Sequence, residues 1–403
     1  MRKNRLFSIL CVTAAFVLGS ISCANSENSA PGEWNGVITE RNGVRVIENP
    51  EDPMFEDLTL ELEEDLRIGG EEENTSFIRV GGVSVDGEGA IYIADAGNHR
   101  IQKFGPDGSF RATCGRQGQG PGEFDRLSAF FVPGNGRIYA VDGMRMQRFD
   151  PSGVFEKSVP LKNRLSRFLV SPDESILGVE TRNTEQGRRQ FLVRLDPEGG
   201  DAEELGDYSD VTAIDQRDEG RTMRVVIVHG LNARLLLSQG PGSAIYSAFA
   251  AEYEIQRRGT DGAPDLIIQK AEDPVPVSEA EKERIVSSLL ENLVVRNRNI
   301  REDIVRQGCR FPTHRPFFSD LLVDDRGRIF TLRIRSPLVE DETRILDVFD
   351  ADGRYLCRAV SPVRPWVIRS GFVYDIHEDE ETGDITIRRH LITNWNALPG
   401  GEG

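Results

Sequence analysis

Four polar residues close together in the chain are the side chains best suited by type to contact a ligand: Asp95, Asn98, His99 and Arg100. Within six positions they offer a carboxylate, an amide, an imidazole and a guanidinium. Short Asp and Asn side chains in such a segment more often bond to neighbouring backbone amides of a turn. A structural role is therefore the main interpretation of this group, and ligand binding is the alternative.

The histidines do not indicate a zinc site. They are His99, His229, His314, His377 and His390. No two of them have the spacing of a metal-binding motif, so zinc would need ligands from distant parts of the chain. The many carboxylates suit calcium better. We expect no cofactor, with calcium as the alternative. Gly-x-Ser-x-Gly and His-Glu-x-x-His motifs are absent from the sequence, so no catalytic residue is assigned.

The chain begins with the pattern of an export signal. Three basic residues among the first five precede an apolar run, 6–18, which is too short to span a bilayer as a helix. Small residues then lead to Cys23 and a polar stretch. We expect a signal peptide over residues 1–22 and a polar tether over 23–33.

This segment resembles a bacterial lipoprotein signal, in which the cysteine becomes the lipidated first residue. The resemblance places a lipid anchor at Cys23 as the chain's membrane contact. Ser20 stands where such signals usually carry an aliphatic residue, so ordinary signal cleavage is the alternative. Either route takes the protein to the cell envelope, and the lipoprotein would face the periplasm or the exterior.

Export leaves three further cysteines in the body of the chain, Cys114, Cys309 and Cys357. An odd number cannot all form disulfides. Isolated buried thiols are the main interpretation, and a disulfide between Cys309 and Cys357 is the alternative, since an oxidising compartment permits one.

The charge of the chain argues against binding to nucleic acid. It has 66 acidic and 49 basic residues, a net charge of −17, whereas phosphate binding needs a basic face. The charge is unevenly distributed, because residues 98–167 contain 12 basic and 6 acidic residues and residues 40–73 contain 3 basic and 13 acidic ones. Solvated surface is the default explanation. A basic rim that receives an anionic glycan is the alternative.

A unit of four short strands recurs along the chain. In the clearest copy the alternating apolar segments are 80–86, 90–95, 100–104 and 109–113. The Asp107-Gly108 pair between the last two is typical of a type I′ hairpin turn. Phe104 and Phe149 occupy the same place in successive copies and are 45 residues apart, which is the length of one four-stranded propeller blade.

A second copy follows at 128–159, and the unit repeats again at 318–360. Two more degenerate copies lie between them, at 167–205 and 225–270, and a sixth unit runs over 366–392. The last copy lacks a strand. We expect an N-terminal strand around Val44–Ile47 to complete it, which would close the ring and protect an open sheet edge.

Three segments resemble the NHL repeat of the six-bladed, TolB-like β-propeller group: Ile91–Asp95, Asn98–Phe104 and Gly118–Phe124. The similarity is sharp over residues 80–155 and weaker to about residue 392. It implies an all-β, six-bladed β-propeller of four-stranded antiparallel blades over residues 34–396, followed by a flexible tail at 397–403. Some propellers of this group are lyases or lactonases that hold calcium or zinc in the central channel.

A helical insertion is predicted over residues 274–308, between blades four and five. Ser278 and Glu281 form a capping box. Apolar residues then recur at helical spacing, at Ile285, Leu289, Leu293, Ile300 and Ile304. Packing of this stripe against the propeller is the main interpretation. A lid across the channel mouth is the alternative.

These observations predict an exported, lipid-anchored propeller that acts as a binding or scaffold module through its loop rims and central channel. Its partner would be a protein or glycan that the sequence does not identify. The alternative is a metal-dependent enzyme of the lyase or lactonase type with a calcium or zinc ion in the channel.

Overall fold

The computed structural model describes residues 32–400, apart from 71–74, 186, 201, 210–212, 219–220, 227–228 and 296–301. The predicted signal peptide, the predicted anchor Cys23 and most of the predicted tether lie outside the described residues. Among the described helices, none combines the length and the apolar character needed to cross a membrane.

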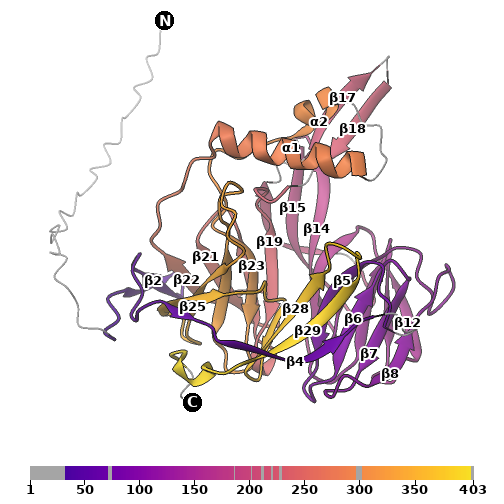
Figure 1. Cartoon of the computed structure of the whole chain (residues 1–403), viewed down its shortest axis with the longest axis horizontal. Coiled ribbons are helices and arrows are strands. Elements are labelled where there is room, and N and C mark those ends of the chain that lie inside the picture. The colour runs from indigo at the N-terminus through magenta and orange to yellow at the C-terminus, as the bar shows by residue number, and fades with distance from the viewer. Residues whose placement is uncertain are drawn as a thin grey trace, which may run out of the picture.

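Six antiparallel sheets succeed one another along the chain (Figure 1). The first contains β5 (Val80–Val85), β6 (Ile91–Asp95), β7 (Arg100–Phe104) and β8 (Phe110–Cys114). The second contains β9 (Leu127–Phe131), β10 (Ile138–Asp142), β11 (Arg145–Phe149) and β12 (Phe155–Pro160). The third contains β13 (Leu165–Val170), β14 (Ile176–Thr184), β15 (Gly187–Leu195) and β16 (Glu203–Ser209).

The other three sheets follow the same order. The fourth contains β19 (Leu235–Gln239), β20 (Ile245–Phe249), β21 (Glu254–Arg258) and β22 (Pro264–Lys270). The fifth contains β23 (Phe318–Val323), β24 (Ile329–Arg333), β25 (Arg344–Phe349) and β26 (Tyr355–Ser361). The sixth begins with β27 (Val367–Arg369), β28 (Phe372–Glu378) and β29 (Ile385–Ile392).

The first strand of each sheet lies at the centre of a closed ring. Going round it, β5 contacts β9, β9 contacts β13, β13 contacts β19, β19 contacts β23, β23 contacts β27, and β27 contacts β5 again. This arrangement is a six-bladed β-propeller, as the repeats predict.

Apolar side chains hold the ring together, because one buried cluster lies between each pair of neighbouring sheets. At the junction of the last sheet and the first, Tyr374 and Ile387 pack with Ile91 and Phe104. Burial of apolar surface on both faces of every sheet is the main driving force for this fold.

The ring is closed by a different strand from the one that the sequence analysis named. β4 (Leu62–Ile68) pairs antiparallel with β29 and completes the sixth sheet. β2 (Val44–Asn49), which contains the predicted strand Val44–Ile47, instead pairs parallel with β22 of the fourth sheet. The prediction of this pairing was wrong, because alternation shows that a strand has an apolar face but not which sheet edge it joins.

Two further N-terminal strands also lie along outer edges. β1 (Val37–Arg41) pairs with β2, and β3 (Leu58–Thr59) pairs parallel with β26 of the fifth sheet. The segment 37–68 therefore crosses the outer edges of the fourth, fifth and sixth sheets in turn.

The turns between outer strands depend on recurring Asp and Gly residues. Asp150 Oδ1 accepts hydrogen bonds from the backbone amides of Ser152 and Val154, both at 2.9 Å. At the Asp107-Gly108 turn, glycine has φ 79° whereas Asp107 keeps a negative φ, and the register of β7 and β8 shifts next to Phe104. A type I′ turn needs positive φ at both central residues, so that prediction was wrong and the turn is a glycine-containing bulged one.

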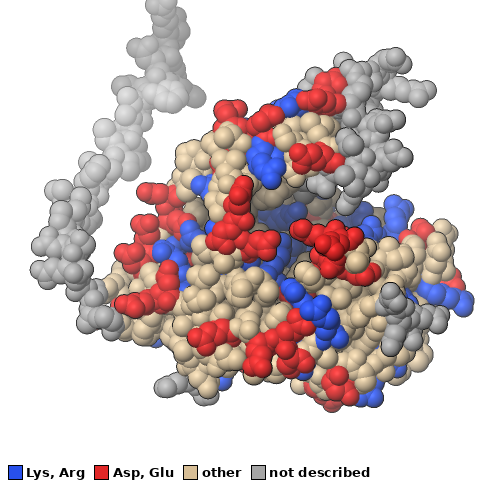
Figure 2. Space-filling model, in the orientation of Figure 1, with Lys and Arg blue, Asp and Glu red and all other residues tan. Residues whose placement is uncertain are grey.

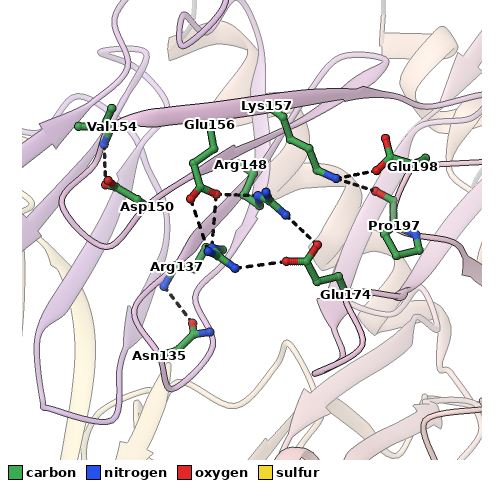
Figure 3. Close-up of polar contacts among 10 residues, drawn as sticks. All are labelled: Asn135, Arg137, Arg148, Asp150, Val154, Glu156, Lys157, Glu174, Pro197 and Glu198. Carbon is green, nitrogen blue, oxygen red and sulfur yellow. Dashed lines mark hydrogen bonds and ion pairs between the residues drawn. The ribbon is translucent and has the colours of Figure 1, made fainter.

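Charged side chains also join neighbouring blades. Arg137 and Arg148 of the second sheet each contact both Glu156 of their own sheet and Glu174 of the third (Figure 3). Beside them, Lys157 Nζ donates to the Pro197 carbonyl and pairs with Glu198 (Figure 3).

A similar contact recurs at other junctions. Lys103 donates to the Pro151 carbonyl, and Arg389 of the sixth sheet donates to the Pro106 carbonyl of the first, at 2.9 Å and 2.7 Å. Each bond runs from a strand of one blade to the turn carbonyl of the next, so these contacts fix the angle between adjacent blades as well as their separation.

Helices α1 (Glu279–Val295) and α2 (Glu302–Gly308) lie between the fourth and fifth sheets in the chain, which confirms the predicted insertion. The Ser278 amide donates to Glu281 Oε2 at 2.9 Å, and the Glu281 amide donates to Ser278 Oγ at 3.3 Å, which forms the predicted capping box. Figure 1 shows α1 across one end of the propeller, above β14 and β15.

The helices have a small core of their own. Val286, Val305 and Cys309 are buried together, with Leu289 and Phe311 packed against them. Of the predicted stripe, Leu289 thus packs with Val305 of α2 and with Phe311 of the segment that follows it. The side chains of Leu293 and Ile304 lie outside the part of the chain whose side chains are described. Ile300 lies outside the described residues.

Three smaller elements complete the fold. They are the hairpin β17 (Ala213–Asp218) and β18 (Arg221–Val226) and the short helices η1 (Pro241–Ser243) and η2 (Trp395–Ala397). The hairpin was not predicted from the sequence, and its last residues fall in the segment 225–270 that was predicted as the fourth blade. At the C-terminus, buried Leu398 accepts a hydrogen bond from Arg328 through its carbonyl, so the predicted tail begins with a fixed contact.

The three cysteines of the propeller are buried thiols without a disulfide, as the main interpretation expects. The alternative pairing of Cys309 with Cys357 is not formed. Burial in apolar surroundings raises the pKa of the Cys114 and Cys357 thiols to about 12.

A buried ion pair lies between the fourth and fifth sheets. Lys270 Nζ contacts Glu272 Oε2 at 2.7 Å with its own side chain fully buried, and the ammonium lies 5.0 Å from the ring centres of Tyr253 and Tyr355. Glu272 also accepts hydrogen bonds from Arg333. Burial alone would raise the pKa of Glu272, but the bonds from Arg333 and Lys270 outweigh it and hold that pKa below its usual value.

We expect Glu272→Gln to lower the free energy of unfolding by about 3–5 kcal/mol, because it leaves the Lys270 ammonium buried without its counter-charge. Urea denaturation at pH 7 measures this loss. Since the folded pKa of Glu272 lies below the unfolded one, the contribution is complete above about pH 5 and disappears as pH falls through the folded pKa.

Glu198→Gln is the matched control, because Glu198 pairs with Lys157 through a side chain that is 78% exposed. Its loss is expected to stay below about 1 kcal/mol. Equal losses in the two variants would contradict the buried-pair explanation.

Candidate functional site

The innermost strands of all six sheets enclose a central channel with a volume of about 890 Å³. Its wall is made by β5, β9, β13, β19, β23 and β27, together with the segments next to them. Ligand-binding pockets in proteins commonly have about 300–1,000 Å³. The channel is therefore large enough to enclose a small molecule.

One end of the channel faces the helices. β14 and β15 are nine residues long, and they extend past the propeller rim toward α1 (Figure 1). Thr181 and Arg188, in the extended part of these strands, line the channel. Figure 2 shows a hollow between the layer that carries α1 and the propeller, with Lys and Arg side chains on its walls.

Three charged side chains meet across this end of the channel. Arg364 Nη2 lies 2.6 Å from Asp320 Oδ2, and Arg167 Nη1 lies 3.7 Å from Asp320 Oδ1. Arg167 belongs to the third sheet and Asp320 to the fifth, so the contact between them crosses the channel. We call Arg167, Asp320 and Arg364 the channel triad. It contains two guanidinium groups and one carboxylate.

Backbone irregularities position two members of the triad. The strand register shifts between Leu165 and Arg167 in β13 and between Phe318 and Asp320 in β23. Such bulges change the direction of the side chains that follow them. Buried Leu165 and Phe318 hold the strand on the side before each bulge, so the charged residue after it can line the channel.

The third member lies just before β27. The Trp366 amide donates to the Tyr374 carbonyl at 2.8 Å, which fixes the entry into the strand. The Arg364 guanidinium lies 5.5 Å from the centre of the Trp366 ring. Trp366 and Arg364 both line the channel.

Serine residues form a second group on the channel wall. Ser84, Ser128 and Ser166 donate their hydroxyl hydrogens to the carbonyls of Val132, Val141 and Val179, at 3.4, 3.2 and 3.2 Å. A hydroxyl that donates in this way keeps its oxygen lone pairs as acceptors. All three serines line the channel.

The site residues that the sequence analysis named lie on the rim, outside the channel lining. Asp95 is fully buried and accepts hydrogen bonds from the Ile78 amide at 3.2 Å, Arg100 Nε at 3.1 Å and Asn98 Nδ2 at 2.6 Å. His99 has φ 56° at the turn between β6 and β7.

The next blade repeats this arrangement, with Asp142 bonded to Arg145 and to the Asp125 amide. In both blades an aspartate at the end of the second strand thus accepts a hydrogen bond from the backbone just before the innermost strand. Ligand binding by Asp95, Asn98, His99 and Arg100 stays a prediction.

The channel triad was not among the residues predicted from the sequence. Alignment of the repeats contains a signal for it, because Ser128, Ser166 and Ser319 each bond to a carbonyl 13 residues later in the chain. The residue after each serine is Ala129, Arg167 or Asp320. These three residues occupy one repeat position, and all of them line the channel. The presence of charged residues at a position that is alanine in another copy could therefore have indicated a binding site there.

Metal-binding geometry is a separate question. Within the described ranges, no three or more His, Cys, Asp or Glu side chains come together in a group that could hold a metal ion.

Comparisons with known proteins agree with the architecture. A family model, DUF5128, described as a 6-bladed beta-propeller, matches residues 73–216. The sequence matches none of the curated proteins significantly.

Solved structures include several similar chains. A protein of Bacteroides fragilis described as exported is 13% identical and has a TM-score of 0.49, with 86% of this chain and 99% of that chain covered. A gluconolactonase of Xanthomonas campestris is 13% identical with a TM-score of 0.41, over 79% and 87% of the chains. A virginiamycin B lyase of Staphylococcus aureus is 12% identical with a TM-score of 0.38, over 81% and 99%. Values at this level do not carry a function from one protein to another.

We expect Arg100→Ala to lower the free energy of unfolding by about 3–5 kcal/mol, because the fully buried Asp95 carboxylate would lose its charged partner. Chemical denaturation measures the change, and Arg111→Ala on the exposed strand β8 is the control. Retention of full stability in Arg100→Ala would show that the ion pair between Arg100 and Asp95 does not stabilise the fold.

Proposed function

We propose that the protein is an exported module, lipid-anchored at Cys23, that binds a small anionic molecule in its central channel. The export signal and the cysteine that follows it support the location. The polar stretch after Cys23 would act as a tether between the membrane and the propeller.

The channel triad is the observation that carries the proposed binding. Two guanidinium groups share one carboxylate, so the triad has a formal charge of +1 within a chain of net charge −17. Asp320 is 17% exposed, and both arginines are more exposed than that toward the channel. An anion placed beside them would gain charge-assisted hydrogen bonds from guanidinium groups that the protein already holds in position.

The helical insertion would then control access. α1 and α2 have their own small core. α1 lies across the end of the propeller toward which β14 and β15 extend (Figure 1). Arg167 lies near that end, because Leu165 pairs with Glu180, just before the extended part of β14. This placement favours the lid interpretation of the insertion over packing on a sheet. A ligand would enter beneath α1, through the hollow that Figure 2 shows.

Ligand-observed NMR with a panel of anionic, neutral and cationic small molecules tests the binding proposal. We expect anionic members to give saturation-transfer signals with the wild type. Gly82→Trp should abolish these signals, because Gly82 lines the channel and an added side chain there would point toward Phe130, 3.2 Å from its Cβ position.

The control is Arg111→Trp on the outer strand β8, which places the same ring far from the channel and should leave the signals unchanged. Circular dichroism checks that both variants fold. Signals that are equal in the wild type and in folded Gly82→Trp would place the binding outside the channel and contradict the proposal.

A further inference from the structure

We infer that the channel is built for an acidic saccharide, that is, a sugar that carries a carboxylate. This inference rests on the proposed function and adds the chemical class of the ligand. It combines three features of the channel wall: an unbalanced positive charge, a set of fixed hydrogen-bond acceptors and a half-buried aromatic ring.

The positive charge accounts for the carboxylate. Arg364 and Arg167 approach Asp320 from different blades, and each guanidinium has five N–H donors. One Asp320 carboxylate cannot accept all of them. A second carboxylate, supplied by the ligand, would accept hydrogen bonds from donors that Asp320 leaves over and bring the formal charge of the site to zero.

The serine hydroxyls account for the ligand's hydroxyl groups. Ser84, Ser128 and Ser166 donate their hydroxyl hydrogens to backbone carbonyls. Toward the channel, their Oγ atoms therefore act as hydrogen-bond acceptors. A simple aliphatic or aromatic acid has no donor to match them and would leave these oxygens without a partner in a desolvated site. A molecule with several O–H groups matches the wall.

Trp366 accounts for the sugar ring. It is half-buried, lines the channel and has its ring centre 5.5 Å from the Arg364 guanidinium, so a carboxylate on the arginine brings the rest of the ligand close to the indole. Sugar rings have an apolar face of C–H groups, and an aromatic side chain offers a flat apolar surface that such a face can cover. Phe130 and Phe131, which are also half-buried, extend the apolar part of the wall.

These three features are compatible with one placement of the ligand in the channel. The carboxylate of the sugar would lie at the channel triad, under the helices. Its hydroxyl groups would face Ser128 and Ser166, which lie at the level of the triad, and Ser84, which lies further along the channel. Neutral sugars would lack the charged contact, and acids without hydroxyl groups would lack the serine contacts.

Isothermal titration calorimetry with D-galacturonate, D-galactose and phenylacetate tests the inference on the whole propeller. Galactose lacks the carboxylate, and phenylacetate lacks the hydroxyl groups. We expect galacturonate to bind at least about tenfold more tightly than either, because one charge-assisted hydrogen bond contributes about 1.5–3 kcal/mol.

Variants assign the contacts. Arg364→Gln should raise the Kd for galacturonate about 10- to 100-fold, and Arg167→Gln is a second variant in case the first does not fold. Ser166→Ala should weaken galacturonate about three- to tenfold and leave phenylacetate unchanged. Arg111→Gln, on the outer strand β8, is the matched control and should have no effect.

Each contrary result has a distinct meaning. Equal binding of galactose would overturn the role of the carboxylate. Equal binding of phenylacetate, insensitive to Ser166→Ala, would overturn the saccharide and leave the anion-binding channel intact. If none of these anions bound and the NMR panel also showed no anion in the channel, the proposed function itself would fall.

Discussion

Closure of the ring is the constraint on which every other feature of this protein depends. β4 comes from the N-terminal part of the chain and supplies the outermost strand of the sixth sheet, whose other strands come from the C-terminal part. This pairing covers an edge that would otherwise be open and holds the sixth sheet against the first, where Ile68 packs in the shared apolar cluster. Without it, β27 would lose its fixed place beside β5, and the central channel would have no sixth wall.

In this closed ring, the residues that stabilise the fold and the residues that could bind a ligand lie in different regions. Apolar side chains fill the six junctions between sheets, and charged contacts such as Lys270–Glu272 lie there as well. The axis is different, because inner strands from six sheets converge there without filling the space. Residues from separate repeats, such as Arg167 and Asp320, can therefore contact one another across the channel although they are 153 positions apart in the sequence. The rim residues Asp95 and Arg100 belong to the stabilising part of this division.

The sequence predicted the propeller well because local signals repeat. Alternation, Asp-Gly turns and a 45-residue period each depend on neighbouring residues, and they identified the sheets and the helical insertion with its capping box. Edge pairing is not local, which is why Val44–Ile47 was assigned to the wrong sheet. The channel triad was missed for the same reason, since Arg167 and Asp320 become neighbours only after the ring has closed. The bonds of Asp95 within the blade agree with the structural role that was the main interpretation of this polar group.

A crystal structure of the protein soaked with galacturonate tests the central claim most directly, because the claim concerns where in the ring a carboxylate is held. We expect the sugar inside the channel, with a carboxylate oxygen about 2.7–3.2 Å from a guanidinium nitrogen of Arg364 or Arg167. The sugar ring should lie beside Trp366. Clear density for the sugar on a loop rim or an outer sheet edge, with an empty channel, would contradict the account.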